Sequence, residues 1–236
     1  MINSNPSIQQ LIRSGILTNT SKALQLALSS HKEIDWEPYI SLATWLQKQK
    51  IIPQPSPVLA DCLVQLFSFS TLDLSNKALQ QVHTSLGLLE HLTHLNISGN
   101  QLKKLPISIG MLPKIERLEL QNNQLLALPE SIGLLPTLVT LNLANNQLHV
   151  LPDSLALLLN LQNFSLANNQ LEAIPTDIGW LSKLNFLDLH GNQITIIPTF
   201  IKELQQLEVL NLSANPLIPE ELLKAKKLLP NTQIIF

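Results

Sequence analysis

The feature that most constrains this chain is a pattern of apolar residues that returns every 23 residues. Seven units start near residues 69, 92, 115, 138, 161, 184 and 207, and the first of them is the least regular. The second unit shows the pattern in full, as Leu92, Leu95, Ile97, Asn100, Leu102, Leu105, Pro106, Ile109, Gly110 and Leu112. A period of this length is typical of solenoid proteins, in which each short unit buries its apolar side only against its neighbours.

Each unit predicts one short strand followed by a compact return segment. Leu95 and Ile97 are two residues apart, so in an extended segment both point to one side of a sheet. The return from Pro106 to Leu112 is too short and too interrupted by proline for a long α-helix, which favours turns or 3₁₀ structure. Strands stack about 4.8 Å apart, and the bulkier return segments need more room. The sequence therefore predicts a parallel sheet that curves, with its strands on the concave side.

These residues and spacings resemble the leucine-rich repeat family, in the variant whose consensus reads L-x-x-L-x-L-x-x-N-x-L-x-x-L-P-x-x-I-G-x-L. The resemblance covers the chain from about Phe69 to its last residue. It implies an α/β leucine-rich-repeat solenoid whose usual role is protein recognition. Stand-alone repeats of this type also resemble bacterial proteins and the intracellular Ras-associated group, a similarity that implies regulation of a signalling protein.

One asparagine per unit falls where the predicted strand turns away, at Asn100, Asn123, Asn146, Asn169, Asn192 and Asn215. We expect a buried ladder of side-chain amides that satisfy turn backbone groups removed from water by stacking. In the first unit Lys77 takes this place, so its turn is expected to be irregular.

Three segments follow from this frame. Residues 1–68 read as a helical N-terminal cap or as a small second binding module, with a helix from Trp36 through Leu46 and a proline linker at 53–57. Residues 69–217 hold the repeats, and residues 218–236 form a C-terminal capping helix and strand. Cys62 falls on an apolar helix side, which favours a small buried hydrophobic residue over a nucleophile.

The frame also predicts which residues project from the concave sheet. Binding energy concentrates in aromatic and arginine anchors, so two clusters are candidate partner-binding sites: His94 with Arg117 and Glu119, and Phe186 with Asp188 and His190. The face as a whole is slightly acidic, which favours a partner with some basic character. The alternative is that these are solvated residues with no partner contact.

The convex side offers a rival surface. The residue after the repeat glycine position is apolar in five units, at Leu88, Met111, Leu134, Leu157 and Trp180. Partial burial against neighbouring units would explain this stripe. Otherwise it predicts an assembly surface, and hence a structural, self-associating protein as the alternative function, since contiguous apolar patches usually meet a partner.

Several function classes are disfavoured. The net charge of −2 gives no electrostatic footprint for nucleic acid, and no stretch approaches the roughly 20 apolar residues of a membrane span. The frame places Asp188, His190 and Ser213 together, but on an open face whose backbone N–H groups are used by the sheet, which argues against a catalytic triad. No histidine or cysteine spacing predicts a metal site, and no motif predicts a cofactor.

The sequence also predicts the cellular compartment. The chain has one cysteine, so it can form no internal disulfide, and it has no basic start followed by an apolar run. The sequence thus predicts a cytoplasmic, non-catalytic scaffold that binds a protein.

Overall fold

The computed structural model describes residues 37–52 and 68–236. It divides the chain into two compact units, Met1–Phe69 and Ser70–Phe236. In the first unit, helix α3 spans Glu37–Lys48 and buries Leu42, Ala43 and Leu46, as the apolar spacing of that segment predicts. The remaining helices expected in residues 1–68, the proline linker and Cys62 lie outside the described residues.

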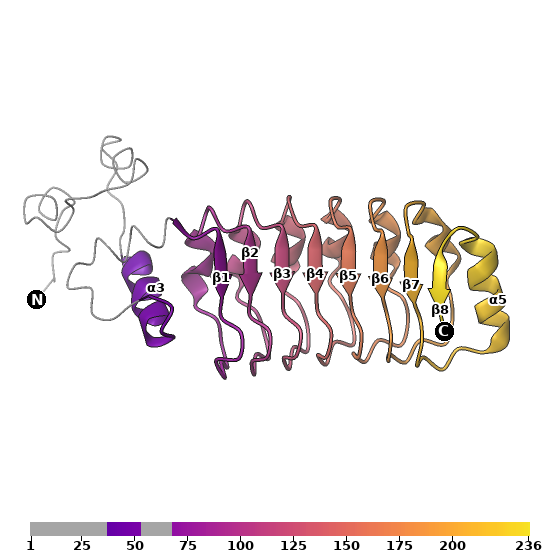
Figure 1. Ribbon diagram of the computed structural model, residues 1–236, viewed down its shortest axis with the longest axis horizontal. Coiled ribbons are helices and arrows are strands. Elements are labelled where there is room, and N and C mark those ends of the chain that lie inside the picture. Colours follow the sequence, from indigo (N-terminus) through magenta and orange to yellow (C-terminus); the bar gives the residue numbers. More distant parts are fainter. Residues whose placement is uncertain (1–36, 53–67) are drawn as a thin grey trace, which may run out of the picture. The chain divides into compact units, whose positions relative to one another are not determined.

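The second unit contains one open parallel sheet of eight strands, ordered β1 to β8 as in the sequence. The strands are β1 Thr71–Asp73, β2 His94–Asn96, β3 Arg117–Glu119, β4 Thr140–Asn142, β5 Asn163–Ser165, β6 Phe186–Asp188, β7 Val209–Asn211 and β8 Gln233–Ile235. Figure 1 shows them as a row on one side of the unit, with short helical segments on the other side. The predicted fold class, a solenoid built on a parallel sheet, is confirmed.

The return segments are five-residue 3₁₀ helices, as predicted. They are η1 Thr84–Leu88, η2 Ile107–Met111, η3 Glu130–Leu134, η4 Asp153–Leu157, η5 Thr176–Trp180 and η6 Thr199–Glu203. A proline precedes each of them from η2 onward; Pro129, for example, has φ −72° and ψ 149°. Proline fixes φ near this value and has no N–H to donate, so it suits the residue before a short helix.

The core is a ladder of side chains from the middle of each strand. Leu95 pairs with Leu118, Leu118 with Leu141, and Leu141 with Phe164 along the sheet. All four are almost completely buried. Because successive strands carry the same residue in the same register, each repeat covers the apolar side of the one before it.

The predicted asparagine ladder is present and buried from Asn100 to Asn192. The Asn146 amide donates to the carbonyl oxygens of Leu120 and Leu143, at 3.1 and 3.0 Å, and its Oδ1 accepts from the Leu125 N–H at 3.0 Å. One side chain thereby joins backbone groups of two neighbouring turns. The first turn, where Lys77 replaces the asparagine, is irregular as expected: the Lys77 N–H donates to Asn100 Oδ1 at 3.0 Å, and Ala78 has a positive φ of 54°.

The repeat glycines allow the 3₁₀ helices to stack closely. A Cβ atom on Gly110 or Gly133 would overlap the backbone carbonyl oxygen of Ser131 or Ser154 in the following helix. At Gly179 the nearest atom is only the ring edge of Phe200, 3.0 Å away. The glycine requirement is therefore strict in η1 to η3, whereas η4 carries Ala156 at this position and the space at Gly179 in η5 is less restricted.

The stack ends in helix α5, Pro219–Leu228, which packs against η6, and in strand β8. Proline at the first helical position and Glu220 and Glu221 in the first turn favour helix initiation here. Glu221 Oε2 accepts from the Ile197 N–H at 2.6 Å, which ties the helix to the last full repeat. None of the helices in the described part of the chain has the length and apolar character needed to cross a bilayer.

Candidate functional site

The outward side of the eight-stranded sheet, here called the sheet face, is the surface on which the predicted partner-binding residues lie. In strands β1 to β7 the middle residue is buried, while the residues on either side of it project outward. The register aligns these outward residues into rows, for example Asp73, Asn96, Glu119 and Asn142. Backbone hydrogen bonds along the sheet hold the rows in place, so the face is a rigid platform.

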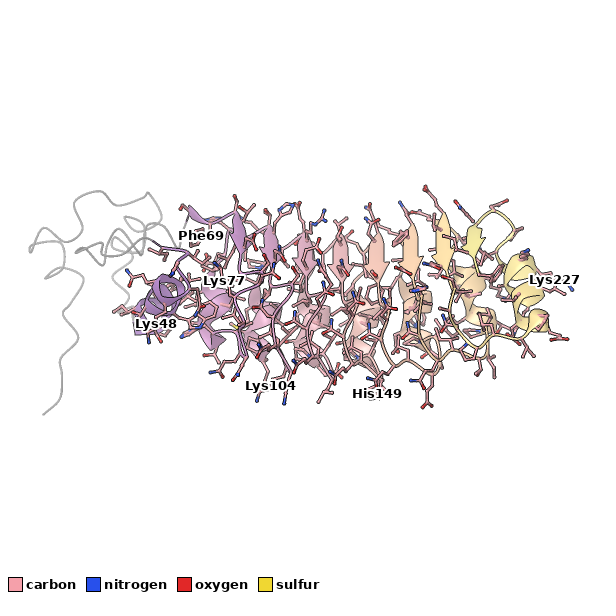
Figure 2. The ribbon with its side chains drawn as sticks, turned by 60° about the horizontal axis from the view of Figure 1, so that its bottom comes forward. Lys48, Phe69, Lys77, Lys104, His149 and Lys227 are labelled. Carbon is pink, nitrogen blue, oxygen red and sulfur yellow. The ribbon has the colours of Figure 1, made fainter. Side chains whose placement is uncertain are left out.

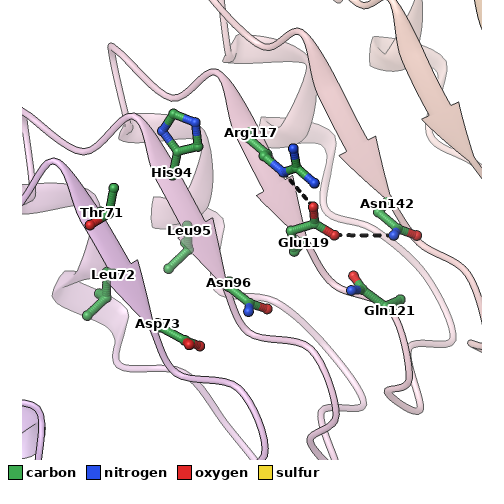
Figure 3. Close-up of a pocket in the computed structure, with 10 residues that line it drawn as sticks. All are labelled: Thr71, Leu72, Asp73, His94, Leu95, Asn96, Arg117, Glu119, Gln121 and Asn142. Atoms are coloured by element: carbon green, nitrogen blue, oxygen red, sulfur yellow. Dashed lines mark hydrogen bonds and ion pairs between the residues drawn. The ribbon is translucent and has the colours of Figure 1, made fainter.

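A hollow of about 540 Å³ lies over strands β1 to β4. Figure 3 shows the residues that line it, which include His94, Arg117 and Glu119 from the first predicted cluster. Arg117 is exposed and Glu119 is half-buried. The three side chains that the sequence spacing groups together thus line one hollow.

An ion pair fixes the arginine in this hollow. Arg117 Nε lies 2.6 Å from Glu119 Oε1, and the other carboxylate oxygen of Glu119 accepts from Asn142 Nδ2 at 3.2 Å. The glutamate side chain is only 13% exposed, whereas that of the arginine is 55% exposed. Glu119 therefore anchors the Nε edge of the guanidinium, and the remaining N–H groups are presented to solvent (Figure 3).

Two more polar groups in the hollow are notable. The pKa of Asp73 is lowered from its ordinary value of 3.8, chiefly because the backbone N–H of Ser75 donates to its carboxylate at 2.8 Å. Asp73 is thus negatively charged at neutral pH. Gln121 has a buried amide oxygen with no hydrogen-bond partner. A buried acceptor without a partner is uncommon in folded proteins.

A second hollow, of about 370 Å³, continues along the sheet face over strands β3 to β6. It shares Arg117, Glu119 and Asn142 with the first and reaches Phe186 at its other end. Phe186 is half-buried, so part of its ring remains available to a partner. The first predicted cluster and Phe186 of the second therefore lie along one continuous depression that crosses six strands, whereas Asp188 and His190 line neither hollow.

The second cluster is held by its own hydrogen bonds. His190 Nδ1 lies 2.8 Å from Ser213 Oγ, and that hydroxyl donates to Asn211 Oδ1 at 2.6 Å. Since the serine proton goes to Asn211, the imidazole donates to the serine and does not accept from it. Asp188 accepts from the backbone N–H of His190 at 3.1 Å and not from its ring. This arrangement lacks the hydrogen bonds that activate a serine nucleophile.

Gln121 and Asn142 also help to form the hollows, although neither was among the predicted partner-binding residues. Their rows could be read from the 23-residue register, but neither is an aromatic or charged residue. Among the residues that lie two positions after the end of a strand, Ser98 after β2 and Ala167 after β5 are buried and offer little surface to a partner. Within the described residues, no group of three or more His, Cys, Asp or Glu side chains is placed to hold a metal ion.

The convex stripe predicted from the sequence lies on the opposite side, on the 3₁₀ helices. Met111, Leu134, Leu157 and Trp180 are 64%, 63%, 58% and 69% exposed. Leu88 is half-buried, so the exposed stripe begins only at Met111. These four residues are called the return stripe below.

Comparison with protein families gives one match. The model described as "Leucine rich repeat" matches residues 68–125, 136–194 and 160–217, which together make up more than half of the chain. Domains of this family generally mediate protein–protein interaction. No curated protein matches the sequence significantly.

Among solved structures, a leucine-rich repeat protein of Leptospira interrogans is 30% identical with a TM-score of 0.50, over 74% of this chain and 56% of that one. The ectodomain of the Arabidopsis thaliana receptor kinase GASSHO1/SCHENGEN3, in complex with CASPARIAN STRIP INTEGRITY FACTOR 2, is 33% identical with a TM-score of 0.59, over 69% and 21%. The plant peptide hormone receptor RGFR1, in complex with RGF2, is 27% identical with a TM-score of 0.56, over 66% and 26%. The chain thus spans between about a fifth and just over half of the length of these proteins.

Proposed function

Because this chain belongs to the leucine-rich repeat family, we propose that it is a non-catalytic module that binds a protein partner on its sheet face. The observation that carries this proposal is the depression across β1 to β6, with a fixed arginine and a half-buried phenylalanine along it. Arginine and aromatic side chains are the usual anchors of protein interfaces. The two plant receptors that resemble the chain bind a peptide or protein ligand, which supports the same role here.

The charges of the sheet face indicate the kind of partner. Asp73, Glu119 and Asp188 occupy the same row of the face. Arg117 neutralises the Glu119 carboxylate and Lys77 contributes to the lowered pKa of Asp73, whereas the strands on either side of Asp188 place no lysine or arginine next to it. A partner segment that carries basic side chains would complement this row, whereas an acidic segment would be repelled. An extended segment that also offers an apolar group for Phe186 fits the face best.

A capture experiment tests the proposal. The full chain and an Arg117→Ala, Phe186→Ala, His190→Ala variant are used as baits in extracts of the native cell, and bound proteins are quantified. We expect the variant to lose the partners that the wild type recovers, because the fixed anchors are gone. A Leu134→Asp chain, altered on the opposite side, serves as the matched control and should retain them. Equal recovery by the wild type and the triple variant would remove the sheet face as the binding site.

The proposal also includes the cellular compartment in which binding takes place. A single cysteine in 236 residues suits a reducing environment, and we propose that binding takes place in the cytoplasm. Cell fractionation with an antibody against the chain would show it in the cytosolic fraction. Recovery from the culture medium or an extracytoplasmic fraction would contradict this.

A further inference from the structure

We propose that the return stripe is the contact surface between two copies of this chain, which pack side by side with their repeats running in the same direction. The stripe plays no part in the proposed binding on the sheet face. It lies on η2, η3, η4 and η5, each of which packs against the next, so its four residues follow one another without interruption.

The apolar surface is broader than these four residues. Two positions further along the repeat, Pro113 and Pro136 are exposed and Leu159 is 57% exposed. A buried aliphatic side chain corresponds to roughly 60–120 Å² and a tryptophan to about 150–250 Å². Five of these residues are between 57% and 69% exposed, and together with the two exposed prolines they offer on the order of 500 Å² of apolar surface. A standard interface buries about 800 Å² per partner, of which roughly 56–65% is apolar. The area available therefore matches what one side of a dimer requires.

Charged residues border the stripe on both sides, and the two borders have opposite sign. Glu130 and Asp153 begin η3 and η4, ahead of the stripe residue in each helix, and Asp177 is the second residue of η5, ahead of Trp180. Lys114 and Lys183 follow Met111 and Trp180 by three residues and are exposed. Because the chain crosses this side in the same direction in every repeat, the acids stay on one border and the lysines on the other.

This arrangement is complementary to a second copy of itself. When two copies meet face to face about a twofold axis that runs along the stripe, the same repeats face each other. Asp177 of each copy then meets Lys183 of the other, while Glu130 and Asp153 meet the neutral residues Thr137 and Asn160. An axis across the stripe would instead bring like charges together. Glu203 occupies the stripe position in η6 and ends the apolar surface there. The charges thus select a parallel dimer of limited length and disfavour a continuous fibre.

Sedimentation equilibrium of the full chain over about a hundredfold range of protein concentration tests the contact, because mass action makes an assembly concentration-dependent. We expect the wild type to shift from monomer to dimer. Leu157→Asp and Trp180→Asp should each raise the dissociation constant at least about tenfold, since each buries a charge in the apolar centre. Both positions are exposed in a single chain, so circular dichroism should show an unchanged fold.

Val150 provides the matched control. It is 66% exposed and lies in the same repeat as Leu157, in the loop before η4. It follows His149, which Figure 2 shows with Lys104 on a border of the unit away from the strands. A Val150→Asp chain should dimerise like the wild type. A wild-type chain that stays monomeric, or a Leu157→Asp chain that associates like the wild type, would overturn the proposal. The apolar stripe would then be a contact surface for a different protein.

A charge exchange tests the orientation. One variant carries Glu130→Lys, Asp153→Lys and Asp177→Lys, and the other carries Lys114→Glu and Lys183→Glu. Each variant alone should be monomeric, because both of its borders then have the same sign. Their mixture should form a mixed dimer in which every border meets its opposite. A mixture that stays monomeric while the wild type dimerises would overturn the parallel arrangement.

Discussion

At the scale of single residues, the buried asparagines form hydrogen bonds with backbone groups, which no apolar side chain could do. Each repeat turns away from the sheet and leaves backbone N–H and C=O groups that stacking removes from water. Asn146 satisfies such groups in its own turn and in the preceding one. An unsatisfied buried polar group costs about 1–3 kcal/mol, so one asparagine can decide whether two repeats stay together.

We expect Asn146→Ala to lower the free energy of unfolding by about 1–3 kcal/mol, because several buried backbone groups lose their partner. Asn163→Ala, on the exposed sheet face, should change it by less than about 0.5 kcal/mol. Asn215→Ala should fall between them, since Asn215 is only half-buried and water can replace its amide. Urea denaturation of the three variants measures the order of these losses in the free energy of unfolding. Equal losses at all three positions would contradict the ladder's structural role.

At the scale of elements, the glycines set the distance between 3₁₀ helices. A Cβ at Gly133 would overlap the backbone of Ser154, whereas at Gly179 it would meet only a phenylalanine ring edge. We expect Gly133→Ala to destabilise the chain by about 1–3 kcal/mol through overpacking, and Gly179→Ala to cost clearly less. Thermal unfolding of the two variants tests this. The comparison is internally controlled, because both changes add the same methyl group to the same position of a repeat.

The C-terminal helix gives a pH prediction. The pKa of Glu221 is lowered from its ordinary value of 4.5, mainly because its carboxylate accepts from the Ile197 N–H, with a smaller contribution from Lys224. A lowered pKa in the folded state means that the ionised form stabilises the fold above pH 4.5. This contribution is lost as pH falls below 4.5 and through the folded-state value.

Glu221→Gln should therefore be less stable than the wild type at neutral pH, and the difference should shrink as the pH is lowered below 4.5. Thermal unfolding of both chains across this range measures the difference. A gap that stayed constant at acidic pH would show that the carboxylate charge does not hold α5 to the last repeat.

Most of the elements in the second unit could be predicted, because the same residue types recur at the same positions of every repeat. A pattern seen in one repeat can therefore be checked in the others. The strand positions, the 3₁₀ returns after Pro106 and its equivalents, and the terminal helix all follow from spacing. Spacing could not show that Ser98 and Ala167 are buried or that Leu88 is half-buried. The exposure of a position outside the strand depends on how closely neighbouring turns approach, which one repeat does not encode.

At the scale of the whole second unit, the fold separates two surfaces with different chemistry. The sheet face is polar and slightly acidic, and it is hollowed around a fixed arginine. The opposite side carries the apolar return stripe between borders of opposite charge. Two copies joined through their return stripes would leave both sheet faces open, so self-association and partner binding are compatible.

The sequence placed His94, Arg117 and Glu119 in one cluster because they share a register, and the structure brings them into one hollow. It could not reveal the chain of contacts from Arg117 through Glu119 to Asn142, or the unpaired amide oxygen of Gln121. Those depend on side-chain conformation across strands, which a periodic pattern does not determine. A Glu119→Gln chain should accordingly weaken binding less than Arg117→Ala, because it loosens the guanidinium without removing it.

Titration calorimetry with the captured partner tests the central claim, that the sheet face is the binding surface, most directly. Wild type, Arg117→Ala and Trp180→Asp are compared at one protein concentration and one ionic strength. We predict that Arg117→Ala raises the dissociation constant by about tenfold or more, while Trp180→Asp leaves it unchanged. An unchanged constant for Arg117→Ala together with lost binding for Trp180→Asp would contradict the account and move the partner to the opposite side.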